Sequence, residues 1–242
     1  MNRKFLEESL LKMQQDLFNA IKKNGEKGKE SLIRSSQFID QIHQTTKKSF
    51  LMQNKKLFIK PEFNKTNPEE NIQGLIKFKN QDITIRIKDS QYTLPLVVNV
   101  RSQMSSIEKN FDTILERAFA EVVNLRLAKN YIIGEVFLLP FQELDQDACK
   151  KNKVNFFSKT LNFEKFFLRY NLINHRKNYD EDKNNFYKCD KICLLVVDFK
   201  STPPKLVTDF GSDKLNKAYK ELSYEGFCKY LLNKYEKSIS AE

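Results

Sequence analysis

The pattern of hydrophobic and polar positions differs between the start of the chain and the remainder. Near the N-terminus apolar residues recur at helical spacing, which predicts amphipathic helices over residues 4–23 and 31–52. Residues 24–29 contain two glycines among charged residues, which predicts a turn between the two helices. Residues 60–71 are polar and contain two prolines, as is typical of a loop. We therefore expect an N-terminal helical arm over residues 1–55.

Beyond this loop the pattern becomes that of an α/β protein. Ile83, Ile85 and Ile87 alternate with polar residues, which predicts a strand because successive side chains of a strand face opposite sides. Further strands are predicted at 94–103, 131–141 and 192–199, and helices at 111–125, 161–174 and 224–236. This order is typical of a sheet covered by helices. We expect one domain, residues 1–242, whose α/β core spans 74–200 and contains a mixed central sheet flanked by helices.

The charge balance adds a class of partner to this picture. The 242 residues include 42 Lys and Arg against 31 Asp and Glu, which gives a formal net charge of +11. A balance this basic favours a polyanionic partner, and nucleic acid is the usual one. The alternative is a basic interaction protein that binds no polyanion.

Histidine and cysteine are too few for most metal or nucleophilic sites. The presence of only two histidines, His43 and His175, argues strongly against a His-centred triad or a multi-His metal site. Cys189 and Cys193 are close in sequence, but a single pair at this spacing is a poor zinc signature. Reduced thiols are typical of a cytoplasmic protein, and no apolar run of membrane-spanning length occurs. Glycine-rich phosphate loops are also absent from the sequence, so any chemistry must rest on carboxylates, amides, lysine and arginine.

The run LPLVVNVRSQ, residues 94–103, begins as a buried strand and ends in polar groups. Asn99, Arg101 and Gln103 fall at alternate positions, so they project from one face of the strand. Asp82 opens the preceding strand. A nuclease that holds a divalent cation needs carboxylates at adjacent strands, and a common solution is an Asp followed by a (D/E)-x-K tripeptide. Position and period fit this solution here, whereas Asn replaces the acid and Arg replaces the lysine.

The segment VVNVRSQMSSIEKNFDTILERAFAE resembles the active-site strand and following helix of type II restriction endonucleases in the PD-(D/E)XK superfamily. The resemblance covers residues 74–140. It implies a restriction-endonuclease-like fold and Mg²⁺-dependent, sequence-specific cleavage of double-stranded DNA by a homodimer. It also implies a cognate DNA methyltransferase as a genetic partner. The matching residues are Asn99, Arg101, Ser102 and Gln103 on the strand, and Asn110, Phe111, Glu116 and Ala118 on the helix.

The departures from the family pattern require a carboxylate from another position. Asn99 carries no charge, and Arg101 cannot act as a base. Glu116 and Glu121 on the following helix are candidates, because related nucleases place this acid on the helix. We expect Asp82 and Glu116 to hold Mg²⁺. The catalytic candidates are Asp82, Asn99, Arg101, Gln103, Glu116 and Glu121, and the residues expected to contact DNA are Lys79, Ser102, Ser105, Ser106, Lys109, Asn110 and Arg176.

Asp198 and Lys200 offer a rival placement of the same chemistry. They form a literal D-x-K after an apolar run, with Asp180, Asp182 or Asp190 as the upstream acid. Two prolines follow at once, where a passage into a helix would be expected.

Two readings without metal-dependent hydrolysis also stay open. Arg101 could pair with Glu116 or Glu121 as a structural link between strand and helix. The chain could also be a DNA-acting protein of another kind, either a sequence-specific binder or an enzyme that attacks the base or the sugar.

Overall fold

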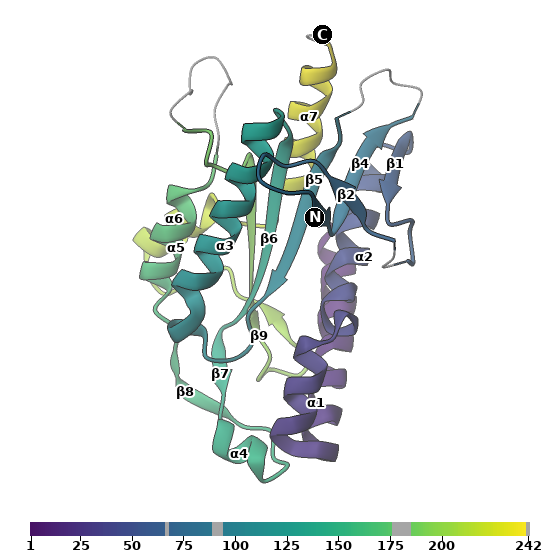
Figure 1. Cartoon of the computed structure of the whole chain (residues 1–242). Helices are drawn as coiled ribbons and strands as arrows, with labels where there is room; N and C mark the ends of the chain where they lie inside the picture. Colours follow the sequence, from purple (N-terminus) through teal and green to yellow (C-terminus); the bar gives the residue numbers. More distant parts are fainter. Residues whose placement is uncertain (66–67, 89–93, 176–184, 241–242) are drawn as a thin grey trace.

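A computed structural model describes residues 1–65, 68–88, 94–175 and 185–240 (Figure 1). The strands of the main sheet are β1 (Leu57–Lys60), β4 (Ile83–Ile87), β5 (Leu96–Ser102), β6 (Ile132–Pro140), β9 (Lys191–Asp198) and β10 (Lys205–Leu206). Their order in space is β1-β4-β5-β6-β9-β10. The pairs β5–β6 and β6–β9 are parallel, and the outer pairs are antiparallel. The chain is therefore an α/β protein with a mixed central sheet, as predicted.

Two small antiparallel sheets lie outside this main sheet. One pairs β2 (Glu70–Ile72) with β3 (Lys79–Gln81), and the other pairs β7 (Gln142–Leu144) with β8 (Phe156–Thr160). In the first of them, β3 leads directly into β4 of the main sheet. None of these four strands, nor β1, was predicted from the sequence, since short strands with half-exposed residues carry little periodic signal.

Helices cover both faces of the main sheet (Figure 1). They are α1 (Arg3–Arg34), α2 (Ser36–Gln53), α3 (Ile107–Ala128), α4 (Gln146–Lys150), α5 (Phe163–Leu172), α6 (Asp213–Lys220) and α7 (Phe227–Ser240). One face packs against α1, α2 and α7, and the other packs against α3, α5 and α6. Among the described residues, no helix combines the length and the apolar character that a membrane span requires.

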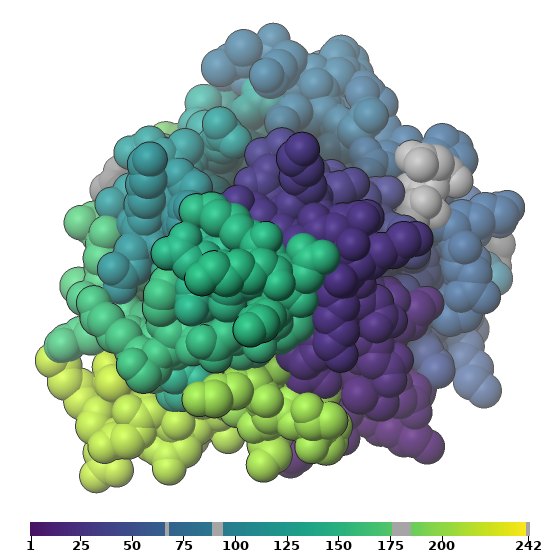
Figure 2. Space-filling view, turned by 90° about the horizontal axis from the view of Figure 1, so that it is seen from below, coloured from purple at the N-terminus to yellow at the C-terminus, as the bar shows by residue number. Residues whose placement is uncertain are grey.

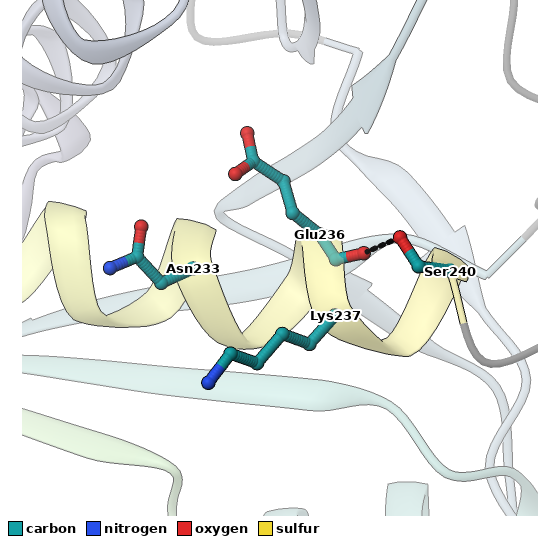
Figure 3. Close-up of a pocket in the computed structure, with 4 residues that line it drawn as sticks. All are labelled: Asn233, Glu236, Lys237 and Ser240. Atoms are coloured by element: carbon teal, nitrogen blue, oxygen red, sulfur yellow. Dashed lines mark hydrogen bonds between the residues drawn. The ribbon is translucent and has the colours of Figure 1, made fainter.

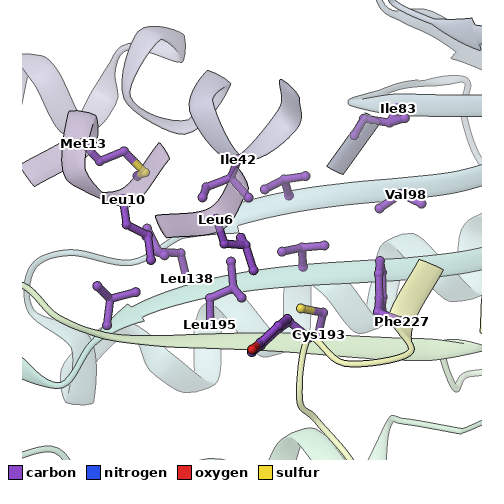
Figure 4. Close-up of a cluster of buried hydrophobic side chains, with 14 of the residues drawn as sticks. Leu6, Leu10, Met13, Ile42, Ile83, Val98, Leu138, Cys193, Leu195 and Phe227 are labelled. Carbon is purple, nitrogen blue, oxygen red and sulfur yellow. The ribbon is translucent and has the colours of Figure 1, made fainter. Parts of the chain in front are cut away.

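Two hydrophobic cores result from the alternation of side chains along the strands. Val98 of β5 faces the first core, whereas its neighbour Val97 faces the second. In the first core, Leu6 of α1 gathers with Leu138 of β6 and Leu195 of β9 (Figure 4). Central strands that are buried on both faces read as continuous apolar runs, which is why β6 and β9 were predicted readily.

The N-terminal arm packs on the sheet and also reaches past its end. The side chain of Lys29 in α1 donates a hydrogen bond to Gln146 in α4. Figure 2 shows the two segments side by side at the lower end of the molecule, α1 in purple and the α4 region in green. The turn predicted over 24–29 is reduced to a kink at Gly25, where φ is 59° and helical hydrogen bonding continues on both sides.

Gly134 was predicted to mark a bulge or a close contact, and the structure shows the close contact. A Cβ atom at this position would lie 2.5 Å from Cδ1 of Leu231 in α7. Helix α7 can therefore approach β6 directly only because residue 134 has no side chain.

Candidate functional site

Asp82, Asn99 and Glu135 form a row across three neighbouring strands. The register of β4 with β5 places Asp82 opposite Asn99, and Asn99 pairs directly with Glu135 of β6. The carboxylate of Asp82 accepts a hydrogen bond of 2.7 Å from the backbone N–H of Val100. The N–H of Asp82 donates to Oδ1 of Asn99 at 3.4 Å. The strand register thus brings together two of the residues singled out from the sequence.

Glu135 is the acid in this row that the sequence did not single out. Its side chain is fully buried, and its Oε1 accepts a hydrogen bond of 3.2 Å from the amide of Asn99. Its Oε2 accepts from Nε of Arg101 at 3.0 Å. Burial raises the pKa of Glu135, and the positive charge of Arg101 opposes that rise. The signal available in the sequence was one acid inside the apolar run IIGEVFLLP.

Arg101 connects this row of residues to helix α3. Its terminal Nη2 donates to Glu121 at 3.0 Å, while its Nε holds Glu135. The two carboxylates raise the pKa of the guanidinium, Glu135 most strongly, so it remains a cation at any working pH. Arg101 therefore links β5, β6 and α3 through charged hydrogen bonds.

The strand β3 brings further polar groups to Glu121. The amide of Gln81 donates to Glu121 at 3.2 Å, and Nζ of Lys79 lies 3.5 Å from the same carboxylate. Lys79, expected to contact DNA, is thus placed beside the candidate catalytic residues.

Glu116, expected to hold Mg²⁺ with Asp82, does not join this cluster. It is exposed on α3, five positions before Glu121. At 3.6 residues per turn, the two side chains therefore point roughly 140° apart around the helix axis. No hydrogen bond or ion pair joins Glu116 to another residue within the described part of the chain. The helical acid that reaches the strand row is therefore Glu121.

Gln103 points into the turn between β5 and α3. Its amide donates to the backbone carbonyl of Ile107 at 2.8 Å, and the residue is buried. It therefore holds the start of the helix, at a distance from the row formed by Asp82, Asn99 and Glu135.

The expected DNA contacts around the start of α3 lie at the end of that helix remote from Glu121. Ser106 is the N-cap with a left-handed backbone, and Glu143 accepts a hydrogen bond from the N–H of Ile107 at 2.7 Å. The helix runs about 21 Å from Ile107 to Glu121 at its usual rise. Ser105, Ser106, Lys109 and Asn110 surround the first turn of α3, and Ser102 is the last residue of β5. Arg176 lies outside the described residues.

The rival placement around Asp198 forms a turn at the end of β9. Oδ1 of Asp198 accepts hydrogen bonds from the N–H groups of Lys200 at 2.9 Å and Ser201 at 3.3 Å. Asp190 lies at the opposite end of β9, where it is buried and pairs with Arg126 at 2.5 Å. The strand separates the two acids, while Asp180 and Asp182 lie outside the described residues.

Two of the carboxylates around Asn99 are already paired with a cation, the guanidinium of Arg101. Within the described ranges, no three or more His, Cys, Asp and Glu side chains are grouped to hold a metal ion. Glu121 and Glu135 are both engaged by Arg101. A divalent ion bound to either carboxylate would be repelled by this permanent positive charge at close range.

His43 of α2 faces the same row from the other side of Asp82. Its Nε2 lies 3.9 Å from Oδ2 of Asp82, and it has no hydrogen-bond partner among the described residues. Burial lowers the pKa of His43, although the carboxylate of Asp82 acts in the opposite direction. An imidazole with a lowered pKa thus lies beside the acid at the start of β4.

The pocket drawn in Figure 3 is lined by one helix among the described residues, unlike the row of Asp82, Asn99 and Glu135. Its lining side chains, Asn233, Glu236, Lys237 and Ser240, all come from α7. Ser240 donates a hydrogen bond to the backbone carbonyl of Glu236, which is ordinary helix chemistry. Among the described residues its lining comes from one helix, whereas the row on β4, β5 and β6 joins three strands and helix α3, so this row is the stronger candidate site.

Comparisons with protein-family models, curated proteins and solved structures found no match.

Proposed function

We propose that this protein is an endonuclease that cleaves double-stranded DNA at specific sites, in the manner of a type II restriction endonuclease. The observation that carries the proposal is the row of Asp82 and Asn99, completed by Arg101 and by Glu121 from the crossing helix. The mixed sheet with helices on both faces agrees with the fold that the sequence resemblance implies. The net charge of +11 suits a polyanionic substrate.

Arg101 and Asp82 have distinct chemical roles in this proposal. The guanidinium of Arg101 offers several N–H donors and a permanent positive charge, which suit phosphate oxygens and the charge that develops during hydrolysis. Oδ1 of Asp82 accepts no hydrogen bond from the described residues, so it can orient an attacking water or accept its proton. Lys79 adds a second cation beside the site.

Mg²⁺ dependence is the part of the proposal that the arrangement of carboxylates supports least. The resemblance implies Mg²⁺, whereas Arg101 occupies the place between Glu121 and Glu135 that a cation would take. Dependence on Mg²⁺ is therefore a separate measurement from dependence on Asp82.

Plasmid digestion by the purified protein tests the proposal. Wild type, Asp82→Ala and Glu116→Gln are compared in buffers containing Mg²⁺ or EDTA. Discrete fragments from wild type and Glu116→Gln, lost in Asp82→Ala, support the proposed site. Equal cleavage by wild type and Asp82→Ala sinks the assignment of Asp82, and absence of cleavage in both buffers contradicts the endonuclease.

A second candidate function is a DNA-acting protein that works without metal-dependent hydrolysis. The ion pairs of Arg101 with Glu121 and Glu135 favour it, because they satisfy the acids without a metal. Site-specific DNA binding without a cleaved product, or a product that forms in EDTA, would select this candidate.

The resemblance also implies partners for the proposed enzyme. A homodimer would let two sites act on the two DNA strands, and analytical ultracentrifugation with and without DNA measures that state directly. A DNA methyltransferase gene beside the gene for this protein would support a role in restriction–modification in the cytoplasm.

A further inference from the structure

The loop between β2 and β3 exposes three large apolar side chains. The exposed fraction is 59% for Leu75, 85% for Ile76 and 62% for Phe78. Single exposed apolar residues are normal on protein surfaces, but three within four positions form a patch. Such a patch indicates contact with another molecule.

The backbone of this loop is held firmly by Asn124 of α3. The N–H of Leu75 donates to the backbone carbonyl of Asn124 at 2.8 Å. The N–H of Ile76 donates to the side-chain Oδ1 of Asn124, also at 2.8 Å. The amide nitrogen of Asn124 donates in turn to the carbonyl of Lys77 at 3.1 Å. One buried side chain therefore fixes the loop while the apolar side chains point outward.

Gly74 makes this attachment possible. A Cβ atom at this position would lie 2.0 Å from Nδ2 of Asn124, so any side chain would push the loop away from α3. The exposed apolar residues are thus presented on a defined backbone, which lowers the entropic cost of inserting them into a partner.

The loop lies next to the candidate site. Strand β3 follows it, with Lys79 and Gln81 against Glu121, and Asp82 comes next. Four residue steps separate Phe78 from Asp82, which limits their Cα atoms to about 14 Å. That span corresponds to about four base pairs of DNA at a rise of roughly 3.4 Å each.

The charge of the loop suits DNA as its partner. The segment GLIKFKNQ, residues 74–81, alternates apolar residues with Lys77 and Lys79 and contains no acid. Proteins that kink duplex DNA insert Phe, Leu or Ile between base steps and hold the flanking phosphates with basic residues. A second copy of this basic chain would place lysines against lysines here, whereas a duplex offers stacked bases between phosphates.

We propose that residues 74–79 form a wedge that enters duplex DNA beside the cleavage site. Ile76 and Phe78 separate a base step near the reacting phosphate, with Phe78 at most about four base pairs from it, and Lys77 and Lys79 contact the flanking phosphates. This inference rests on the proposed function for its ligand and adds a distortion of the DNA to it. Separation of a base step kinks the duplex and brings more of its backbone onto the basic surface.

Base unstacking and bending of a short duplex test the wedge. The duplex carries 2-aminopurine at successive positions and a fluorescence donor and acceptor at its ends, in buffer with EDTA. Wild type is compared with Ile76→Ser/Phe78→Ser and with the control Leu168→Ser/Leu172→Ser, whose residues are 61% and 53% exposed on α5. Thermal melting checks that all three proteins are folded.

We expect wild type and the α5 control to raise 2-aminopurine fluorescence at one base step and to bend the duplex. The wedge variant should lose both signals and bind about tenfold or more weakly, because stacking on bases is lost. Binding by wild type without unstacking or bending overturns the wedge. A wedge variant that keeps the fluorescence and bending signals also overturns it. A variant that changes only its oligomeric state overturns it too, and would assign the loop to contact between copies of the chain.

The outcomes separate this inference from the proposed function. Unstacking and bending in a protein that cleaves DNA under no condition would contradict the endonuclease and leave the wedge in place. Cleavage without unstacking would support the endonuclease and contradict the wedge. Failure to bind duplex DNA would overturn the endonuclease and the wedge together.

Discussion

The amide of Asn99 donates a hydrogen bond of 3.2 Å to the buried carboxylate of Glu135 on the neighbouring parallel strand. The nuclease pattern that the sequence resembles has an acid at the position of Asn99. The structure places an acid one strand away, at a strand spacing of about 4.8 Å. Arg101 then holds this displaced charge through its Nε. The pairing gives the departure from the family pattern a physical basis that can be tested residue by residue.

Arg101→Met should destabilise the protein strongly. It leaves Glu135 buried without its cation, and loss of one partner of a buried ion pair typically costs about 3–5 kcal/mol of unfolding free energy. Urea unfolding near neutral pH measures the change. Arg3→Met is the matched control, because Arg3 pairs with Glu7 at the exposed surface, where water and salt screen the interaction. Equal losses in the two variants would contradict a structural role for Arg101.

Glu121→Gln should reduce DNA cleavage far more than Glu116→Gln. Glu121 orients Arg101, whereas Glu116 lies on a different, exposed side of α3. We expect roughly a hundredfold or greater loss of rate for Glu121→Gln, because a displaced catalytic group typically costs this much. Single-turnover cleavage assays measure both rates. A larger loss for Glu116→Gln would restore the original expectation that this acid serves the site.

All four cysteines should be unreactive in the folded protein. The structure describes Cys149, Cys189, Cys193 and Cys228 as free, buried thiols. Burial raises the pKa of Cys193 to about 12 and that of Cys228 to about 11, so their reactive thiolate forms are scarce. A thiol reagent such as DTNB should react slowly with native protein and rapidly with all four thiols in denaturant. Rapid reaction of any thiol under native conditions would contradict this burial.

His175 should titrate below the usual pKa of a histidine. Burial and the ammonium group of Lys191 lower its pKa, while the carboxylate of Glu221 acts in the opposite direction. The folded state therefore takes up this proton less readily than the unfolded chain. The contribution of His175 to the free energy of unfolding is therefore fully present above its pKa in the unfolded chain. It is lost as the pH falls through its lower pKa in the folded protein.

Two measurements check His175. NMR titration should give a midpoint below about 6.5 in wild type, the ordinary value for histidine, and a higher midpoint in Lys191→Met. The free energy of unfolding should fall less steeply on acidification in His175→Gln than in wild type. His43 keeps its own contribution in that variant, so some slope should remain.

Gly74→Ala should detach the β2–β3 loop from α3. The added methyl group would collide with Asn124, and such overpacking typically costs about 1–3 kcal/mol. Hydrogen exchange at the amides of Leu75 and Ile76 should accelerate, because both donate to Asn124. Gln73→Ala, on the exposed neighbour, is the control and should leave exchange unchanged. Protection that survives Gly74→Ala would show that the loop has another anchor.

The strand with Asn99 and Arg101 could be predicted because its alternation is local. Asp82 could be predicted as its neighbour because β4 and β5 follow one another in an antiparallel pair. Glu135 could not be assigned a role, because its neighbour depends on the register of two parallel strands joined through α3. A lone acid in an apolar run was the only local sign of it.

The helical repeat of α3 distinguishes Glu121 from Glu116. Ala118 and Val122 are buried, and Glu121 adjoins Val122 on the helix, whereas Glu116 lies on a side that faces solvent. The helical repeat alone would have ranked Glu121 first. The loop with Leu75, Ile76 and Phe78 could not be foreseen as exposed, since its apolar residues resemble those of a buried strand.

Glu121 and Asn124 are three positions apart on α3, within one helical turn of about 5.4 Å. Glu121 contacts Arg101, and Asn124 carries the β2–β3 loop. The two contacts therefore share a single turn of one helix. If the protein acts on DNA as proposed, the position of the loop and the position of the guanidinium would both depend on this turn.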